Sequence, residues 1–372
     1  MRILHLGKYY HPHRGGMETA LREMAEGLLA QGAAVSVLVA GGGRGTPEAL
    51  DGGRGRLVRA WTPAVVNSQP LTPTLVPLLR RELARFRPDL VHLHLPNPLA
   101  ALAWRAAAGG RRGLPPLAVW HHADITRQRW GRLVAGPLQE GCLARAAGIA
   151  VSSEAHRRGS RELAGHRGKV AVVPFGLDPA PWRELAATGT GPFLFIGRLV
   201  RYKGLPVLLE ALREVPAARL TVVGTGPLEA DLARQAQRLG VGDRVEWVGD
   251  RAPHELRRHL AAARALVLPS LDTSETFGLV QLEAMAAGVP VIASDLPTGV
   301  REVADAGASH LLVRPGDPRE LAAALRTLLE DPARARAMGE AGRARQLRHY
   351  TRDAMCERLL AWYDELLSGE RT

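Results

Sequence analysis

Cysteine and lysine are scarce in this 372-residue sequence, which has two cysteines, Cys142 and Cys356, and three lysines among its 49 basic residues. The cysteines are far apart and have no partners at metal-ligand spacing, which argues against a disulfide framework and a thiolate zinc site. We expect both to be small buried hydrophobic side chains. No uninterrupted apolar run reaches the roughly 18–20 residues that a membrane span needs. The sequence therefore predicts a globular protein without a transmembrane helix.

Two motifs of other enzymes are also missing. The first predicted strand ends at Gly7 and is followed by Lys8-Tyr9-Tyr10 instead of Gly-x-Gly-x-x-Gly, so a nicotinamide-dependent dehydrogenase is a poor fit. No Asp-x-Asp pair marks an evident metal site.

The first residues are a short strand-like run broken by Lys8 and Pro12, which does not resemble a secretion signal. We expect a cytoplasmic protein.

The basic charge has two interpretations. A net charge of +12 and a pI near 10.7 invite a nucleic-acid partner. The arginines are dispersed along predicted helices, however, without a basic tail, an aromatic RNA-binding pattern or a helix-turn-helix, so we expect no nucleic acid. A cationic face beside an anionic membrane that carries a lipid acceptor is the milder alternative. Arg and Trp interleave at 127–134 as in interfacial segments, although a solvated helix face with a core tryptophan is favoured.

Short β-branched runs alternate with amphipathic stretches along the chain, as in doubly wound parallel sheets. In the first half, strands are predicted at 2–6, 35–39, 57–61, 90–93, 117–120, 149–152 and 170–173, with the clearest helices at 18–31, 75–87 and 154–163. In the second half, strands are predicted at 193–196, 220–223, 245–248, 265–268, 289–293 and 310–313, and helices at 205–215, 228–239, 255–262, 279–287, 319–330, 332–349 and 353–367.

The densest Pro/Gly segments, 174–181 and 188–192, indicate a linker between the two halves. The sequence thus predicts an α/β protein with two doubly wound parallel-sheet, Rossmann-like domains, residues 1–178 and 190–350. A final helical segment spans residues 351–372.

Two glutamates, Glu275 and Glu283, are separated by seven residues across a Phe277-Gly278 turn. A carboxylate can accept two hydrogen bonds from vicinal hydroxyls, so one acid suits a ribose and the other a hexose. The backbone N–H groups around Phe277-Gly278-Leu279, at a predicted helix start, can hold sugar hydroxyls or phosphate. Two solvated glutamates are the ordinary alternative, but the surrounding residues are mostly apolar. The pattern favours a site that recognises a polyol or a nucleotide.

Two cations flank the loop after the first strand of the second half. That strand ends at Gly197, and Arg198 and Lys203 follow before the next helix. Cations at such a position can neutralise a diphosphate and stabilise it as a leaving group. Gly224 and Gly226 end the next strand, where glycines permit close approach of a base or phosphate. That second signal is weak, because strand–glycine turns are common in α/β folds.

In the first half, Gly15-Gly16 places bare N–H groups at a helix N-terminus, which suits a phosphate or an acceptor. A tight turn would need the same residues. We expect Gly16 to be functional, and the nearby Glu18 to stabilise the first helical turn.

Histidines end two neighbouring strands of the first half. His121, His122 and Asp124 follow one strand and point toward the ligand-binding edge of a parallel sheet. His92 and His94 end the strand before it, and two histidines at this spacing could chelate a metal if the same edge had more ligands. Without such a motif we expect packing, or contact with an acceptor by His94.

Together these motifs resemble those of retaining glycosyltransferases of family 4 (group 1), over nearly the whole chain. The matching patterns are the paired glutamates, Gly-Arg-Leu…Lys-Gly at 197–204, Gly-Gly-x-Glu at 15–18 and His-x-Asp-Ile at 122–125. The resemblance implies the GT-B architecture, in which the two domains face each other across a cleft and the last helix crosses back to the first domain.

The resemblance also implies roles for individual residues. Glu283 holds the nucleotide ribose, and Glu275 contacts the transferred sugar or the charge that develops on it. His122, which fits the pattern better than His121, contacts the donor sugar, and Asp124 is assigned with His94 to the acceptor. Arg251 lies in a loop that resembles the base-contacting loop of the family.

The implied reaction moves a hexose from a GDP-sugar or UDP-sugar to a hydroxyl of a glycan or lipid-linked acceptor, with retention of anomeric configuration. GDP-mannose is slightly preferred as the donor, and no metal is required. An association with the inner face of a membrane is an open alternative to a freely soluble enzyme. A nucleotide-sugar epimerase of the GT-B fold, which needs no acceptor, is the second enzymatic hypothesis.

Overall fold

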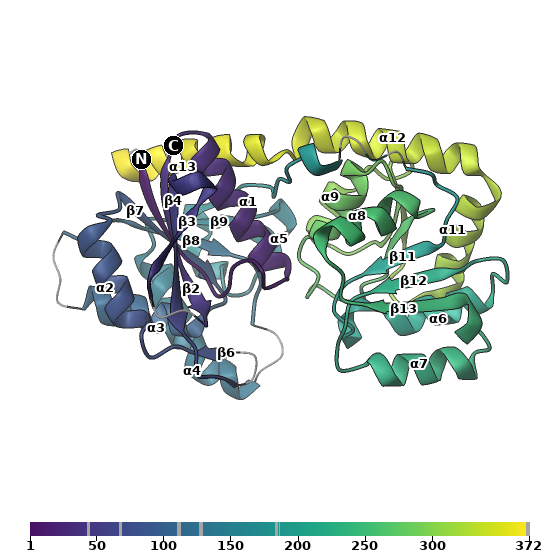
Figure 1. Cartoon of the computed structure of the whole chain (residues 1–372), viewed down its shortest axis with the longest axis horizontal. Coiled ribbons are helices and arrows are strands. Elements are labelled where there is room, and N and C mark those ends of the chain that lie inside the picture. Colours follow the sequence, from purple (N-terminus) through teal and green to yellow (C-terminus); the bar gives the residue numbers. More distant parts are fainter. Residues whose placement is uncertain are drawn as a thin grey trace. The chain divides into compact units, whose positions relative to one another are not determined.

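The computed structural model describes residues 1–42, 45–66, 69–109, 113–125, 129–182, 185 and 187–369, with side chains except those of 129–134. It divides into two compact units (Figure 1). Unit 1 comprises Met1–Gly176 and Arg352–Thr372, and unit 2 comprises Leu177–Thr351. The last helix, α13 (Arg352–Ser368), therefore belongs to unit 1 although it follows unit 2 in the sequence.

Unit 1 contains an eight-stranded sheet in the order β10-β9-β8-β7-β1-β2-β4-β3. All neighbouring strands are parallel except β3, which pairs antiparallel with β4 at the edge. The strands are β1 (Arg2–Leu6), β2 (Ala34–Gly41), β3 (Pro47–Leu50), β4 (Gly55–Trp61), β7 (Leu90–Leu95), β8 (Leu117–His121), β9 (Gly148–Val151) and β10 (Val170–Val172). The chain order reverses between β1 and β7, which makes this pair the topological switch point.

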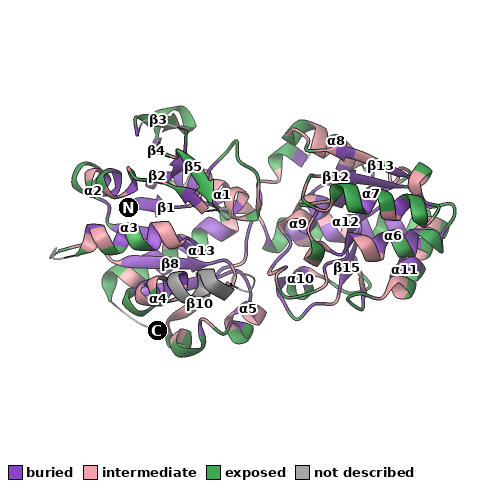
Figure 2. Cartoon of the chain, turned by 90° about the horizontal axis from the view of Figure 1, so that it is seen from below, coloured by how far each residue is buried: buried purple, intermediate pink, exposed green. Residues whose placement is uncertain are grey.

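Helices of unit 1 are α1 (Gly16–Ala30), α2 (Leu75–Arg85), α3 (Pro98–Ala108), α4 (Arg129–Arg145), α5 (Glu154–Gly159) and α13. Helix α3 begins where sequence chemistry favours it: the Asn97 side chain accepts from the Ala100 N–H and Pro98 occupies the first turn. A separate hairpin, β5 (Ala64–Val66) with β6 (Gln69–Leu71), joins neither large sheet. Figure 2 shows the contrast between buried β8 and exposed β5, as expected for a central strand and a peripheral hairpin.

Unit 2 contains a six-stranded, entirely parallel sheet in the order β13-β12-β11-β14-β15-β16. The strands are β11 (Phe193–Ile196), β12 (Leu220–Val223), β13 (Val245–Gly249), β14 (Leu266–Leu268), β15 (Val291–Ser294) and β16 (His310–Val313). Here the order reverses between β11 and β14. The helices are α6 (Leu205–Arg213), α7 (Glu229–Arg238), α8 (Pro253–Ala262), α9 (Leu279–Ala286), α10 (Gly299–Val303), α11 (Pro318–Glu330) and α12 (Pro332–His349).

The prediction of two doubly wound parallel sheets is confirmed, and each predicted strand corresponds to an observed one. The largest difference among the predicted helices is at α5, which ends at Gly159 and not at residue 163. The Ser160 hydroxyl donates to Asp124 and accepts from the Leu163 N–H, which holds a turn where the helix would have continued. No helix among the described residues is long and apolar enough to cross a membrane.

Candidate active site

An ion pair lies at the switch point of unit 2. Lys203 lies in the segment after β11, and Glu275 lies in the segment after β14. Their Nζ and Oε2 atoms are 2.6 Å apart, and the side chains are 13% and 9% exposed. The Ser270 hydroxyl donates to the same carboxylate oxygen at 2.9 Å. Two residues 72 positions apart are thus brought together by the strand order, as expected where open α/β sheets bind ligands.

Lys203 remains charged in this setting. Burial alone would lower the pKa of its ammonium group, but the charge of Glu275 opposes burial and the pKa is raised. Neighbouring Arg198 is exposed, and no partner for its guanidinium is recorded among the described residues. The loop therefore presents one cation held in place and one directed to solvent.

The glycines of this edge pack against each other. A side chain on Gly224 (φ +126°) would collide with the carbonyl oxygen of Gly197, and one on Gly226 would collide with the backbone of Leu199. The loops after β11 and β12 thus approach backbone to backbone. Gly197 itself faces Lys203, since a Cβ there would lie 3.5 Å from the lysine Cε. The sequence predicted that these glycines let a nucleotide approach the backbone; in the structure they let the two loops approach each other.

A buried network of polar side chains holds the Phe277-Gly278-Leu279 turn in place. Gly278 adopts φ +70° and precedes the first residue of α9, Leu279. The Gln281 side chain donates to the Phe277 carbonyl at 2.5 Å, and its Oε1 contacts His310 Nε2 at 3.2 Å. The Ser309 hydroxyl contacts the other nitrogen of His310 at 2.8 Å. Burial lowers the pKa of His310 to about 3, so the ring is neutral.

The second glutamate of the pair, Glu283, lies on α9 and is half-buried. Arg251 follows β13, where its guanidinium donates to the carbonyl of the preceding Asp250 at 3.1 Å. The structure thus places Glu283 on the helix that follows the supported turn, and it places Arg251 against its own chain neighbour. The contact of either residue with a nucleotide stays a prediction.

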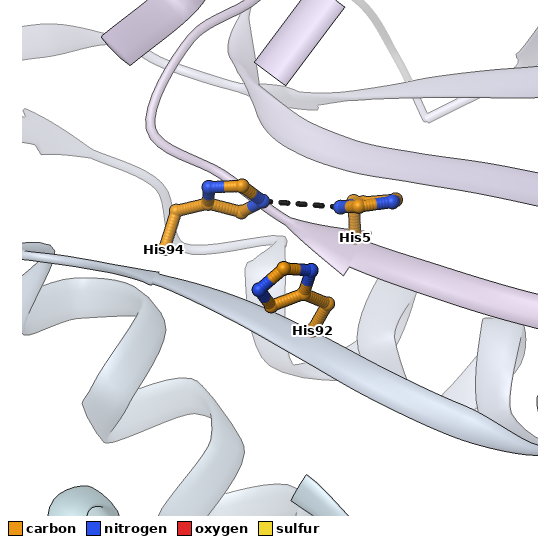
Figure 3. Close-up of side chains that lie close together, drawn as sticks. All are labelled: His5, His92 and His94. Carbon is orange, nitrogen blue, oxygen red and sulfur yellow. Dashed lines mark hydrogen bonds between the residues drawn. The ribbon is translucent and has the colours of Figure 1, made fainter. Parts of the chain in front are cut away.

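Three buried histidines occupy the switch point of unit 1 (Figure 3). His5 comes from β1, and His92 and His94 come from its neighbour β7, where His92 is directly opposite His5. Their exposed fractions are 0%, 0% and 1%. His5 Nδ1 lies 3.0 Å from His94 Nε2, and His92 Nδ1 lies 2.5 Å from the hydroxyl of Tyr363 on α13. Burial lowers the pKa of His5 to about 3 and the pKa values of His92 and His94 well below 6.5.

The two adjacent histidines at the end of β8, His121 and His122, lie in different environments. His122 Nε2 lies 3.1 Å from His94 Nδ1, and its ring stacks on Phe175 with centroids 5.9 Å apart. His121 is fully buried, with Nδ1 3.0 Å from His156 Nε2 and Nε2 3.0 Å from a carboxylate oxygen of Glu162. Both nitrogens of His121 thus contact side chains of the protein interior. Burial lowers the pKa of His122 to about 3.

Two predicted acceptor residues have partners inside unit 1. Asp124 accepts from the Ser160 hydroxyl at 2.5 Å and from the Arg161 N–H at 3.0 Å. His94 is 1% exposed, and both its nitrogens contact other histidines. The His94 ring thus has little accessible surface and both its nitrogens are engaged, and its contact with an acceptor stays a prediction.

Helix α1 begins at the predicted glycine pair, with Gly15 as its N-cap and Gly16 as its first residue. A side chain on Gly15 would collide with the Glu18 carboxylate, so Glu18 lies over the helix N-terminus. This position agrees with the structural role expected for Glu18. Gly16 is exposed. The side chains of the Arg/Trp stretch at 127–134 lie outside the described residues.

Two clusters bring metal-ligating side chains together in the described chain: His5, His92 and His94, and also His121, Asp124 and His156. In the first, His5 Nδ1 and His94 Nε2 face each other at a hydrogen-bonding distance of 3.0 Å. In the second, the ring of His121 is shared between His156 and Glu162, and Asp124 accepts two hydrogen bonds. A metal at either cluster would have to replace hydrogen bonds that these side chains make within the described part of the chain.

Several supporting residues were missed by the sequence analysis: Ser270, Gln281, Ser309, His310, His5, Glu162 and Tyr363. Gln281 offered a signal, because it is a polar residue in an otherwise apolar helical turn. Ser270 and Ser309 lie close in sequence to their partners, Glu275 and His310, but a single serine there is not a distinctive pattern. His5, Glu162 and Tyr363 contact residues far away in the sequence, so no local pattern marks them.

Comparison with known proteins agrees with this geometry. Residues 181–345 match the family Glycosyl transferases group 1, and residues 14–181 match Glycosyltransferase Family 4. The O-antigen chain mannosyltransferase C of Escherichia coli is 29% identical over the full length of both chains. The D-rhamnosyltransferase WbpZ of Pseudomonas aeruginosa is 34% identical over 73% of this chain and 72% of its own.

Solved structures show the same fold. Sucrose-phosphate synthase of Thermosynechococcus elongatus superimposes with a TM-score of 0.80 at 24% identity, covering 99% of this chain and 100% of that protein. The Anabaena protein HepE, in complex with UDP, superimposes with a TM-score of 0.75 at 22% identity, covering 98% and 100%. The chain has the GT-B fold and belongs to the group 1 glycosyltransferases.

Proposed function

We propose that this glycosyltransferase moves a hexose from a nucleoside diphosphate sugar to a hydroxyl of a glycan or lipid-linked acceptor, with retention of anomeric configuration. The observation that carries the proposal is the Lys203–Glu275 pair at the switch point of unit 2, with an ammonium–carboxylate distance of 2.6 Å. A cation beside an acid, at the carboxyl ends of parallel strands, suits a substrate that joins a diphosphate to a sugar.

The donor site is built from the second unit. Lys203 and exposed Arg198 neutralise the diphosphate, and Glu275 accepts from hydroxyls of the transferred sugar or stabilises positive charge on its anomeric carbon. Glu283 holds the ribose of the nucleotide. The N–H groups of the Phe277-Gly278-Leu279 turn hold sugar hydroxyls or phosphate at the start of α9.

Further donor contacts come from Gly16, Gly197, Gly224, Gly226 and Arg251, and Asp124 remains the acceptor candidate. In the reaction, the bond from the anomeric carbon to the diphosphate breaks while a bond to the acceptor oxygen forms on the same face. The acceptor proton goes to the departing diphosphate, whose charge Arg198 and Lys203 stabilise. His122, neutral, contacts the transferred sugar. We propose that no metal is required, because the two cations supply the charge; unchanged activity in a chelator tests this.

Mannose from GDP-mannose is the first donor to test, and assembly of a polysaccharide or glycolipid the first pathway class. The similarity to an O-antigen chain mannosyltransferase supports both. We also propose a peripheral association with an anionic membrane that carries the acceptor, supported by the net charge of +12. Sedimentation with anionic but not neutral vesicles tests the association.

The function is tested by thermal stability with GDP, UDP, ADP and their sugars. A nucleotide at 100 times its dissociation constant should stabilise the protein by about 2.7 kcal/mol. Lys203→Ala should nearly abolish transfer and remove the nucleotide effect, whereas Lys169→Ala, which removes the same charge from unit 1, should change neither. Full activity of Lys203→Ala would refute the assignment. Consumption of the donor without dependence on an acceptor would indicate an epimerase.

A further inference from the structure

We propose that His5, His94 and His122 form a hydrogen-bonded file that fixes the tautomer of His122, so that its Nδ1 carries a proton and donates a hydrogen bond to the substrate. His5 and His94 are then positioning residues that act through His122. The inference rests on the proposed function for the role of the donated bond, but the tautomer itself is a property of the protein alone.

The file is defined by two contacts between three rings. His5 Nδ1 lies 3.0 Å from His94 Nε2, and His94 Nδ1 lies 3.1 Å from His122 Nε2. The rings come from β1, from β7 and from the end of β8, which are consecutive neighbours in the sheet in the order β8-β7-β1. The file therefore runs across the carboxyl edge of the sheet from its interior toward His122, which at 7% keeps more exposed surface than His5 or His94.

Each ring in the file is neutral, because burial lowers the pKa values of all three histidines far below 6.5. A neutral imidazole has one N–H donor and one acceptor nitrogen. Each contact between two rings therefore contains one proton, and the file has only two consistent arrangements. Either every ring carries its proton on Nδ1, or every ring carries it on Nε2. The choice at one end determines the choice at the other.

The buried end decides between the arrangements. His5 Nε2 is fully enclosed and has no hydrogen-bond partner among the described residues. If the protons were on Nε2, this atom would be a buried N–H without an acceptor, and orphaned buried N–H groups are rare in folded proteins. If the protons are on Nδ1, it is an unprotonated nitrogen, and no donor is left unsatisfied. The first arrangement, with every proton on Nδ1, is therefore favoured.

The rings are also held in orientation from the side. The ring of His92 is tilted against both His5 and His94, with centroids 5.1 Å and 4.7 Å away. His92 is in turn held by the Tyr363 hydroxyl at 2.5 Å, which comes from α13. Phe175 stacks on His122 at an interplanar angle of 16°. Rotation of any ring in the file, which would exchange its nitrogen for a carbon, is thus opposed by packing.

The consequence concerns what His122 does to a sugar. With Nε2 accepting from His94, the remaining nitrogen of His122 carries a proton and donates to a hydroxyl oxygen. It cannot accept a proton from that hydroxyl without a shift of every proton along the file. His122 therefore acts as an oriented hydrogen-bond donor and not as a general base.

The tautomer is measured without substrate, by long-range proton–nitrogen correlation spectra of protein with nitrogen-15 histidine, with His122 assigned from the spectrum of His122→Gln. We expect a protonated Nδ1 and an unprotonated Nε2. A protonated Nε2 on His122 overturns the proposal. Stoichiometric zinc retained by the purified protein and lost in His94→Leu would also overturn it, because a metal would take the lone pairs on which the file depends.

Two substitutions of His94 separate the file from simple packing. The amide of asparagine can donate from about the position of Nδ1, so His94→Asn keeps the bond to His122, whereas His94→Leu removes it. We expect kcat to fall about 10-fold in His94→Leu and the nitrogen signals of His122 to become a mixture of tautomers. His94→Asn should retain the Nδ1-protonated pattern and recover most of kcat.

The matched control is His166→Leu, which removes a histidine of the same unit that contacts Glu140 and has no part in the file. It should leave both kcat and the spectrum of His122 unchanged. Equal loss of kcat in His94→Asn and His94→Leu, with the His122 pattern unaltered, would overturn the proposal in favour of packing. If no donor sugar is turned over at all, the proposed function fails, while the tautomer in the spectra still decides the file.

Discussion

Lys203 and Glu275 should stabilise the folded protein as an ion pair, whereas either charge without its partner should lower the free energy of unfolding. Both side chains are poorly hydrated, at 13% and 9% exposure. Removing one partner of a buried pair leaves an uncompensated charge, which costs about 3–5 kcal/mol. We therefore expect Lys203→Met and Glu275→Gln each to lower the free energy of unfolding by about 3 kcal/mol, the former tempered by the Ser270 hydroxyl that remains on Glu275.

The double variant tests this reasoning directly. With both charges removed, no ion is stranded, so its loss of stability should be smaller than the sum of the single losses by at least about 2 kcal/mol. Chemical denaturation of the four proteins, followed by tryptophan fluorescence, measures the coupling. Losses that add within about 0.5 kcal/mol would show that the two groups do not interact in solution, and the assignment of a preorganised pair would be wrong.

The pair also predicts a dependence on pH with a definite sign. Burial would lower the pKa of Lys203, but Glu275 outweighs it and raises the pKa above 10.5. A group whose pKa is raised on folding stabilises the protein fully below the unfolded value, and that stability is lost as the pH rises through the folded value. The wild type should therefore lose the contribution of the pair only above about pH 10.5. Thermal unfolding of Lys203→Met should lack this step.

Two further substitutions probe the supports of the site. Gly224→Ala should lower stability by about 2–3 kcal/mol, because a Cβ there collides with the carbonyl oxygen of the loop after β11 and because φ is +126°. Gly240 is also left-handed (φ +69°), but a Cβ added there would have no atom within 4 Å. Gly240→Ala therefore measures the cost of the backbone conformation alone, about 1 kcal/mol. Equal losses of stability in the two variants on thermal denaturation would refute the collision. Gln281→Leu should destabilise the protein by about 1–3 kcal/mol and raise KM for the donor sugar, because it releases the Phe277 carbonyl and leaves His310 without its amide partner. An unchanged KM in steady-state assays would separate the network from the donor site.

The parallel strands could be predicted because their sequences carry the signal themselves. Strands buried on both faces read as continuous β-branched and apolar runs, as at β11 and β12. Helix α3 carries no such signal, since its Ala-rich sequence PLAALAWRAAA has little amphipathic contrast. The edge strand β3 (Pro47–Leu50) is short and exposed, so it leaves no periodic pattern in the sequence.

The residues of the site could be predicted only in part, because some belong to local motifs and others meet their partners only through the fold. Lys203 and Glu275 belong to local motifs, so the sequence indicated their chemical roles, but it did not indicate that they contact each other. His5 belongs to no motif, and it meets His94 only because β1 and β7, 89 residues apart at these positions, are adjacent strands. The partner of a buried polar group is a property of strand order, which short-range patterns do not encode.

The two switch points show how one topology can hold two chemistries. In unit 2 the strands are followed by Lys203 and Glu275, whose ammonium and carboxylate groups lie 2.6 Å apart. In unit 1 the strands end in rings that burial keeps neutral, and their hydrogen bonds run from ring to ring. A fixed charge is suited to a diphosphate, whereas an oriented neutral donor is suited to a sugar hydroxyl, which a full charge would bind with less directional control. Under the proposed function, the sheet sets where ligands bind, and the solvation of the side chains at its edge sets which part of a nucleotide sugar each unit would recognise.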